Sequence, residues 1–348
     1  MNSTASSAFS SQPISLVRIV ITALHLLLVS VGSGNLLVVL IILLKPYMRT
    51  ITNVYMIGLC LANFTYLANL TLVAATQLND KSWMFGNAVC VLYHGTESTG
   101  KYASVMFVVL LAADRYFAIC KTNHCSRYRN YRTAVISCIC AWLLAILAAL
   151  PLYKYAGVIV IHFHGYSNSH QLCIANWPSS RSARLYITLS SIGIYVLPLI
   201  LIVNFYYRIV RKLREAVLCS KRMHRARSSR TPYHRVTRLV LWVVVFHVMC
   251  WTPFWLFNLF SSILHLRIQS YFHRIIINII HLFPYLNCAL NPLLYATNAE
   301  NFRIAFRSLL LFRSKSRTNG PHFTSCNAED GRLASGEETG FVHSEEID

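Results

Sequence analysis

Long apolar runs, separated by shorter polar and basic stretches, form the dominant pattern of this chain. Seven of these runs reach the length of about 20 residues that a helix needs to cross the hydrocarbon core of a bilayer. They comprise residues 16–44, 52–78, 87–120, 131–151, 183–214, 234–263 and 270–296. The pattern therefore predicts an all-α membrane protein, built as a bundle of seven transmembrane helices.

The composition agrees with a chain that lies mostly in lipid. Hydrophobic residues make up 55% of it and the mean hydropathy is +0.47, which is more apolar than a soluble domain. A formal net charge of +20 would also suit a nucleic-acid-binding protein. That function requires a soluble basic surface, whereas apolar runs occupy most of this chain. We therefore expect the lipid bilayer, and no nucleic acid, as a partner.

Lys and Arg residues mark one side of the predicted bundle as cytoplasmic. The loops on that side carry Lys45 and Arg49, a basic group within 121–132 and a dense basic set within 208–238. The opposite loops are poorer in basic residues, so the positive-inside rule places the N-terminus outside. Asn2 matches the N-glycosylation pattern, which is meaningful only on that outer side.

Three regions follow from this topology: an extracellular N-terminal tail (1–15), a membrane domain (16–311) and a cytoplasmic tail (312–348). The membrane domain ends in NFRIAFRSLLLF, which has apolar residues on one helical face and Arg303 and Arg307 on another. This pattern predicts a short amphipathic eighth helix on the inner membrane surface, with a simple extension of the last span as the alternative. The tail is polar and acidic, and we expect it to be disordered.

Cysteines and histidines carry little sign of metal or catalytic chemistry. Of 11 cysteines, Cys90 and Cys173 share the oxidising outer side, which predicts a disulfide between them, two free thiols being the alternative. No pair has zinc-ligand spacing, so we expect neither a metal nor a cofactor. The histidines are scattered and no nucleophile has a partnered base, so we expect no enzymatic activity.

Several motifs together indicate which class of membrane protein this chain resembles. The third segment ends in ADRYFAIC, the sixth holds CWTPFW, and the seventh holds LNCALNPLLYATN. With Gly34 and Asn35 in the first segment and Trp142 in the fourth, this set resembles the rhodopsin-like (class A) G-protein-coupled receptors over about residues 16–310. RYRNYRTA, VTRLVLWVVVF and the spacing from Cys173 to Pro178 resemble the somatostatin, opioid and allatostatin-C receptor group.

The resemblance implies a plasma-membrane receptor for an extracellular neuropeptide that activates a heterotrimeric G protein, of the Gi/o class. At rest Asp114 would hold Arg115, which in the active state would turn toward Tyr206 and Tyr295. Prolines within spans kink helices, and such a kink beside Trp251 would act as a hinge. The expected switch and coupling residues are Asp114, Arg115, Tyr206, Thr237, Trp251, Pro253, Asn291, Pro292 and Tyr295.

The ligand site is expected at the outer ends of the helices. Glu97 stands where the opioid and somatostatin receptors carry an aspartate that pairs with a ligand amine. Lys101 follows at i+4, on the same helical face, so Glu97 either meets the ligand or is neutralised by Lys101. The expected ligand-binding residues are Gln77, Glu97, Lys101, Phe254, Trp255, Asn258 and Tyr285.

Two further positions depart from the family pattern. Asn63 replaces the aspartate that holds a sodium ion, in a site that Ser104, Asn287 and Asn291 would complete. Because hard cations favour charged oxygen ligands, we expect no sodium-dependent reduction of agonist affinity. His247 stands where most relatives carry phenylalanine, and it either forms a hydrogen bond in the core or fills space.

Other classes of membrane protein fit the sequence less well. A light receptor needs a lysine at the position of Tyr285, and a transporter or channel needs matched broken helices or rows of charge, so we reject both. A receptor for a non-peptide ligand, or an atypical receptor that does not signal, remains the alternative. The tail, with Ser335, Thr339 and Ser344, is either a substrate for a receptor kinase and a partner for arrestin, or merely solvated.

Overall fold

The computed structural model describes residues 16–121, 129–162, 169–222, 232–264, 271–298 and 302–308. Within these residues seven spans are long and apolar enough to cross a membrane, which confirms the predicted bundle. The spans consist of α1 (Leu16–Gly32) with α2 (Gly34–Leu44), α3 (Ile51–Ala68) with α4 (Leu70–Leu78), α5 (Gly86–Cys120), α7 (Tyr131–Tyr155), α8 (Ser180–Ser190) with η3 (Ser191–Val196) and α9 (Leu197–Arg222), α10 (Pro232–Leu264) and α11 (Tyr271–Asn298). A 3₁₀ turn, η1 (Pro46–Met48), joins α2 to α3.

The fourth span is longer than the sequence pattern predicted. We placed its end at Pro151, but α7 continues through this proline to Tyr155. A proline within a helix removes one backbone donor without ending the helix where neighbouring helices support it. The fifth span likewise begins earlier and ends later than predicted, because polar and basic residues at both ends are helical.

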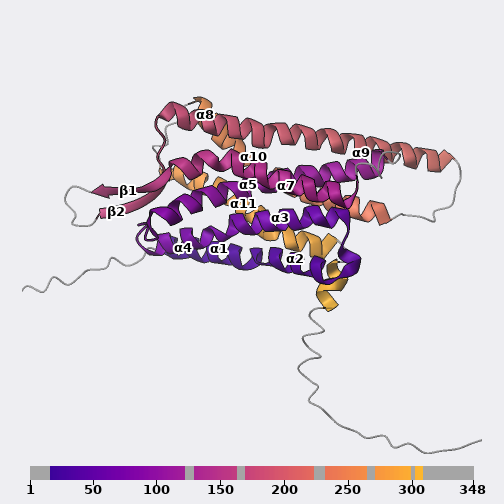
Figure 1. The fold of residues 1–348 in the computed structure, drawn as a ribbon, viewed down its shortest axis with the longest axis horizontal. Helices are drawn as coiled ribbons and strands as arrows, with labels where there is room; N and C mark the ends of the chain where they lie inside the picture. The colour runs from indigo at the N-terminus through magenta and orange to yellow at the C-terminus, as the bar shows by residue number, and fades with distance from the viewer. Residues whose placement is uncertain are drawn as a thin grey trace, which may run out of the picture. The chain divides into compact units, whose positions relative to one another are not determined.

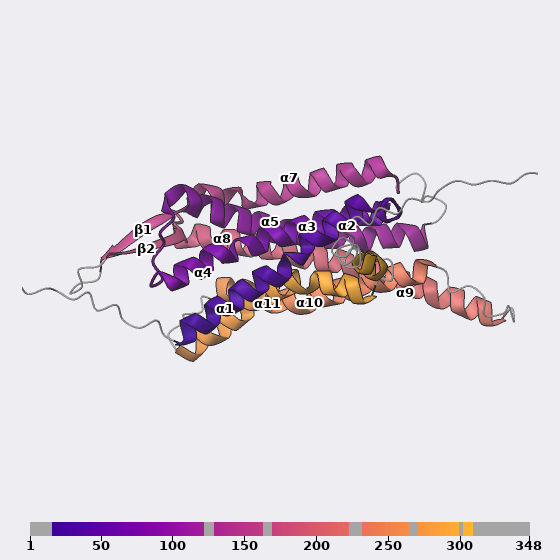
Figure 2. The same cartoon turned by 90° about the horizontal axis from the view of Figure 1, so that it is seen from below.

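Helix α5 lies at the centre of the bundle. It packs against α3, α7, α9 and α10, while α10 packs against α11 and α1 against α4 (Figures 1 and 2). Gly100 permits a close approach of the α3 backbone to α5, because a Cβ there would lie 2.8 Å from the backbone nitrogen of Tyr66 and 2.9 Å from the carbonyl oxygen of Ala62. The helix therefore has neighbours along most of its length, and its side chains reach several spans.

The outer surface of the bundle is more apolar than that of a soluble protein. Large apolar side chains such as Leu143 and Leu147 of α7 are exposed, as expected for a surface that faces lipid. The buried set includes polar and charged residues, among them Asn63, Asp114 and Arg115. Polar groups within spans that face the bundle interior mark functional positions in membrane proteins.

A β-hairpin follows the fourth span, and the sequence analysis did not predict it. Strands β1 (Ala156–His162) and β2 (Ser169–Ala175) pair antiparallel, with Val158 opposite Cys173. They extend from one end of the bundle (Figure 1), which we call the hairpin end. Asn87 at the start of α5 accepts a hydrogen bond from the backbone N–H of Val158 at 3.0 Å. This bond ties the hairpin to the central helix.

Residues 302–308 are helical, and they cover only part of the predicted amphipathic eighth helix. Phe302 is buried with its ring 5.9 Å from that of Tyr295, whereas Arg303 and Arg307 are exposed. The two faces agree with the predicted pattern over this stretch. Its apolar end at Leu309 and Leu310 lies outside the described residues, as do Asn2, the N-terminal tail and the acidic C-terminal tail.

Candidate functional site

Glu97 is bound by a tyrosine from the seventh span. The hydroxyl of Tyr285 donates a hydrogen bond to Glu97 Oε1 at 3.0 Å, which joins α5 to α11. Both side chains are half-buried. Two residues that we assigned to the ligand site, far apart in the sequence, thus lie together.

Lys101 lies one turn deeper on α5 and contacts aromatic rings. Its Nζ is 5.0 Å from the ring centre of Phe254 and 6.0 Å from that of Tyr66. No ion pair between described residues joins Lys101 to Glu97, although the i, i+4 spacing permits one. The two charges therefore have different partners: Glu97 has a hydroxyl, and Lys101 has ring faces.

An aromatic stack lies beneath these charges. The rings of Tyr66 and Tyr285 are stacked 4.4 Å apart with planes within 5°, and Tyr66 is 5.7 Å from Trp251. Phe254 meets Trp251 edge to face at 6.1 Å. Ring pairs at these separations stabilise each other beyond their area of burial. Trp251 is thereby linked to both rings that Lys101 contacts.

The remaining predicted ligand residues take different positions. Trp255 is buried and stacks on Tyr195 of η3 at 5.9 Å, while Asn258 donates to the Phe254 carbonyl oxygen of its own helix at 2.8 Å. Gln77 is half-buried near the end of α4, and no contact between described residues joins it to the Glu97 cluster. The structure thus brings Glu97, Lys101, Phe254 and Tyr285 together, with Trp255 and Asn258 in contact with Phe254.

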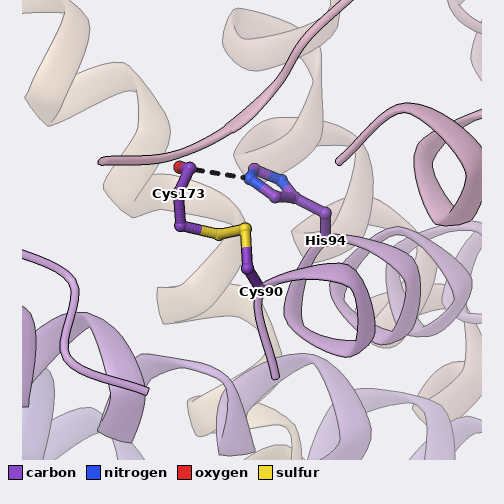
Figure 3. A group of neighbouring side chains, drawn as sticks. All are labelled: Cys90, His94 and Cys173. Carbon is purple, nitrogen blue, oxygen red and sulfur yellow. Dashed lines mark hydrogen bonds between the residues drawn. A yellow bond between two sulfur atoms is a disulfide. The ribbon is translucent and has the colours of Figure 1, made fainter. Parts of the chain in front are cut away.

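A disulfide closes the hairpin end of the site. Cys90 at the start of α5 is bonded to Cys173 of β2, which is the predicted pairing. His94 lies beside it, with Nε2 3.4 Å from the Cys173 carbonyl oxygen (Figure 3). These three side chains are close enough to resemble a metal site. Metals bind thiolates, however, and both sulfur atoms here are used in the disulfide.

A layer of neutral amides lies below Trp251, where the family's sodium site would be. Ser104 donates to Asn63 Oδ1 at 2.9 Å, and Trp251 Nε1 donates to Asn287 Oδ1 at 3.1 Å. Asn63, Asn287 and Asn291 are all buried. No carboxylate of the described residues belongs to this layer. The four residues that we grouped from the sequence, Asn63, Ser104, Asn287 and Asn291, are therefore all buried, and none of them is anionic.

His247 is buried against the same layer. Its ring stacks 5.5 Å from that of Trp251, and neither ring nitrogen has a hydrogen-bond partner among the described residues. The Asn287 side chain lies near this ring, so both possibilities left by the sequence, hydrogen bonding in the core and space filling, stay open.

A charged cluster lies at the end of the bundle opposite the hairpin. Arg115 is only 3% exposed and pairs with Asp114, to which its Nε donates at 3.1 Å. Arg129 also pairs with Asp114, at 2.7 Å from Nε to Oδ1. Thr52 of α3 donates to Asp114 Oδ2 at 2.8 Å and accepts a hydrogen bond from Arg115. One buried carboxylate thus holds two guanidinium groups.

Among the described residues, no hydrogen bond or ion pair joins the other predicted switch residues to this cluster. Tyr206 and Tyr295 are buried, and the Tyr295 hydroxyl lies near the thiol of Cys60. Pro253 and Pro292 lie inside α10 and α11. Thr237 lies in α10, but its side chain is outside the described residues.

A single stripe of α5 links these layers. Glu97, Lys101, Ser104, Val108, Leu111 and Arg115 recur at alternating spacings of four and three residues, which places them along one helical face. The stripe passes from the Glu97 layer through the amide layer and two buried apolar residues to Arg115. At 1.5 Å per residue this path is about 27 Å long.

Sequence reasoning missed several residues of these layers. Tyr66 lies three residues after Asn63 on α3, so the two side chains share a helical face. This spacing could have identified Tyr66 as an inward-facing residue of the site. Thr52 and Arg129 carried no comparable signal, because nothing in their local sequence indicates a contact with Asp114. Their partners are set by how α3, α5 and the segment before α7 meet.

Comparison with known proteins agrees with a receptor built from seven transmembrane helices. Residues 34–295 match the family described as 7 transmembrane receptor (rhodopsin family). The chain is 31% identical over 324 residues to the human neuropeptides B/W receptor type 2, covering 89% of this chain and 91% of the relative. It is 29% identical over 312 residues to the rat somatostatin receptor type 5, covering 87% and 81%, and 28% identical over 327 residues to the mouse somatostatin receptor type 2, covering 92% and 85%. The chain belongs to the rhodopsin family of seven-transmembrane receptors and, within it, to the class A G-protein-coupled receptors of the somatostatin and opioid group.

Proposed function

We propose that this chain is a plasma-membrane receptor, with its N-terminus and hairpin end outside, that binds an extracellular peptide and activates a heterotrimeric G protein of the Gi/o class. The observation that carries the proposal is the stripe of α5, which has Glu97 near one end and Arg115, held by Asp114, at the other. The relatives, which are named as receptors for somatostatin and for neuropeptides B/W, support a peptide ligand.

In this proposal Glu97 is the counterion of a ligand amine. The hydroxyl of Tyr285 keeps the carboxylate directed between α5 and α11, and a cation from the ligand replaces or joins this hydroxyl donor. A cationic donor adds an attraction between opposite charges that the uncharged hydroxyl lacks, so the exchange favours binding.

The signal passes to the opposite end through a change in α10. Trp251, in contact with Tyr66 and Phe254, responds to the ligand, and Pro253 supplies the weak point about which α10 swings. Arg115 then leaves Asp114 for Tyr206 and Tyr295, whose buried hydroxyls accept it, and exposes the surface to which the G protein binds. Arrestin and a receptor kinase would act later on Ser335, Thr339 and Ser344 of the tail.

The proposal is tested by G-protein activation in cells that express wild type, Glu97→Gln or Lys101→Met. The panel consists of somatostatin-, opioid-, allatostatin-C- and neuropeptide B/W-like peptides. We expect one peptide to activate a Gi/o-class protein through wild type, and Glu97→Gln to raise its half-maximal concentration about tenfold or more, because a hydrogen bond to a charged group is lost.

Glu215→Gln is the matched control, because Glu215 is exposed and its ion pair within the described part of the chain is with Arg211 of its own helix. Equal losses in both glutamate variants would show that expression, not recognition, is affected. Activation by a non-peptide compound alone, or by nothing in the presence of surface-expressed receptor, would favour the alternative of an atypical receptor.

A further inference from the structure

Lys101 is a cation without a carboxylate partner in the described part of the chain. The aromatic rings of Phe254 and Tyr66 attract it through their faces, at 5.0 and 6.0 Å. Such an interaction is weaker than a desolvated ion pair with good geometry. The side chain is half-buried among helices, where an uncompensated charge is costly.

The described part of the chain holds few acidic residues that could pair with Lys101. Seven of its 12 acidic residues lie in the last twenty positions, and Glu300 is also outside the described residues. Of the remaining four, Asp80 pairs with Arg18, Asp114 with Arg115 and Arg129, and Glu215 with Arg211. Glu97 alone is near, and the Tyr285 hydroxyl already binds its carboxylate.

Given the receptor function proposed above, on which this inference rests, we propose that Lys101 is an anion-recognition residue that pairs with a carboxylate of the ligand. The ligand carboxylate enters between α3, α5 and α10 and meets the ammonium above the aromatic floor formed by Tyr66, Phe254 and Trp251. Glu97, one turn nearer the hairpin end, binds the ligand's cation. The ligand thus carries both charges, with the acid placed deeper than the amine.

The position of Lys101 also links recognition to the switch. Pairing with an acid draws the ammonium off the rings of Phe254 and Tyr66, and both rings contact Trp251. The contact between Lys101 and the ligand acid is therefore made beside Trp251, the residue that starts the movement of α10.

The test measures binding without signalling. Purified full-length receptor in lipid nanodiscs is titrated with N-acetylated tetrapeptides that end in an aromatic residue, and its melting temperature is recorded. Acetylation removes the amine that Glu97 would bind. Each peptide is supplied in three forms: a free C-terminal acid, a neutral C-terminal carboxamide, and a carboxamide with one internal Asp. The first and third forms separate a terminal carboxylate from an acidic side chain.

We expect at least one acidic form to raise the melting temperature of wild type at concentrations about tenfold lower than the neutral form, as suits a hydrogen bond to a charged group. Lys101→Met should lose this preference, and Lys101→Arg should keep it. Lys154→Met is the matched control and should behave as wild type, because Lys154 also lies over a ring, that of Tyr155 at 5.3 Å, but is exposed at the end of α7.

Equal stabilisation by acidic and neutral forms, a preference that survives in Lys101→Met, or no stabilisation by any form would overturn the assignment. These outcomes are independent of G-protein coupling. A receptor that activates no G protein but shows the Lys101-dependent preference would contradict the signalling proposal alone.

Discussion

Thr52 illustrates how a single neutral side chain can stabilise one state of a charged pair. Its hydroxyl donates to Asp114 and accepts from Arg115, so it bonds to both members at once. The bond from Arg115 to Thr52 exists only while Arg115 remains on Asp114, whereas the bonds of Thr52 with Asp114 and Arg129 do not involve Arg115. In the proposed mechanism Arg115 leaves, so Thr52 loses this bond and stabilises the resting receptor more than the active one.

We predict that Thr52→Val raises basal G-protein activation. The substitution keeps the shape and removes the hydroxyl, and hydrogen bonds to charged groups contribute roughly 1.5–3 kcal/mol, which corresponds to about tenfold or more in the population of active receptor. Basal activity per receptor at the cell surface is the measurement. Thr65→Val, which loses only a bond to the Leu61 carbonyl oxygen of its own helix, should leave it unchanged. Equal basal activity in Thr52→Val and wild type would contradict the role of Thr52.

Asn63 gives a second prediction at this scale. The amide accepts from Ser104 but supplies no charge, so the layer should bind sodium poorly. We expect the agonist affinity of wild type to be the same in sodium chloride and choline chloride, and Asn63→Asp to gain a sodium-dependent decrease. Asn69→Asp serves as the control, because Asn69 is also buried but bonds to Thr65 and Thr96 instead. A sodium effect on wild type would refute this reading.

At the scale of elements, α5 determines the site because it touches most of the bundle. Its stripe from Glu97 to Arg115 places a recognition layer and a coupling layer on one rigid helix. The close approach of α3 at Gly100 brings Tyr66 near Lys101 and Asn63 near Ser104. A change in that approach should therefore disturb both layers together.

Gly100→Ala should lower the melting temperature of the purified receptor. The new Cβ would meet backbone atoms of α3 at 2.8 and 2.9 Å, and backbone moves less easily than a flexible side chain. Overpacking of this kind costs about 1–3 kcal/mol of stability. Gly193→Ala is matched to it, since a Cβ at Gly193 meets nothing within 4 Å, and it should melt at or above the wild-type temperature. If the two variants melt alike, close packing at Gly100 is not a constraint.

At the scale of the whole molecule, the disulfide joins the two ends of a long connection. Cys90 and Cys173 are 83 residues apart, and the bond fixes β2 of the hairpin on the first turns of α5. Both the hairpin and the site beneath it are thereby held in place. Reduction should loosen this end while leaving the seven spans in the membrane.

We predict that the double variant Cys90→Ser, Cys173→Ser melts at a lower temperature than wild type, with a loss of about 2–4 kcal/mol in the free energy of unfolding. Reducing agent should lower wild type to the level of the variant and leave the variant unchanged. Cys140→Ser removes an exposed free cysteine and should have no such effect. Persistence of the wild-type melting temperature under full reduction would contradict a stabilising role.

The sequence alone determined the seven spans and the pairing of Cys90 with Cys173. Both depend on properties that can be read locally: the length and hydropathy of each run, and the side of the membrane on which a cysteine lies. The motifs around Arg115, Trp251 and Asn291 likewise identified the family. Some predicted ends of spans were wrong. At Pro151, for example, the helix continues because support from neighbouring helices outweighs the local effect of the proline.

Only the tertiary structure decided which side chains are partners. From the sequence, Glu97 could pair either with a ligand or with Lys101. The fold instead brings Tyr285, 188 positions away in the chain, to Glu97. The same holds for the contacts of Thr52 and Arg129 with Asp114 and for the hairpin between the fourth and fifth spans. These contacts depend on the rotation and separation of helices, which are set by packing at positions such as Gly100. Hydropathy fixes where a helix crosses the membrane, and packing between helices fixes what each inward side chain meets.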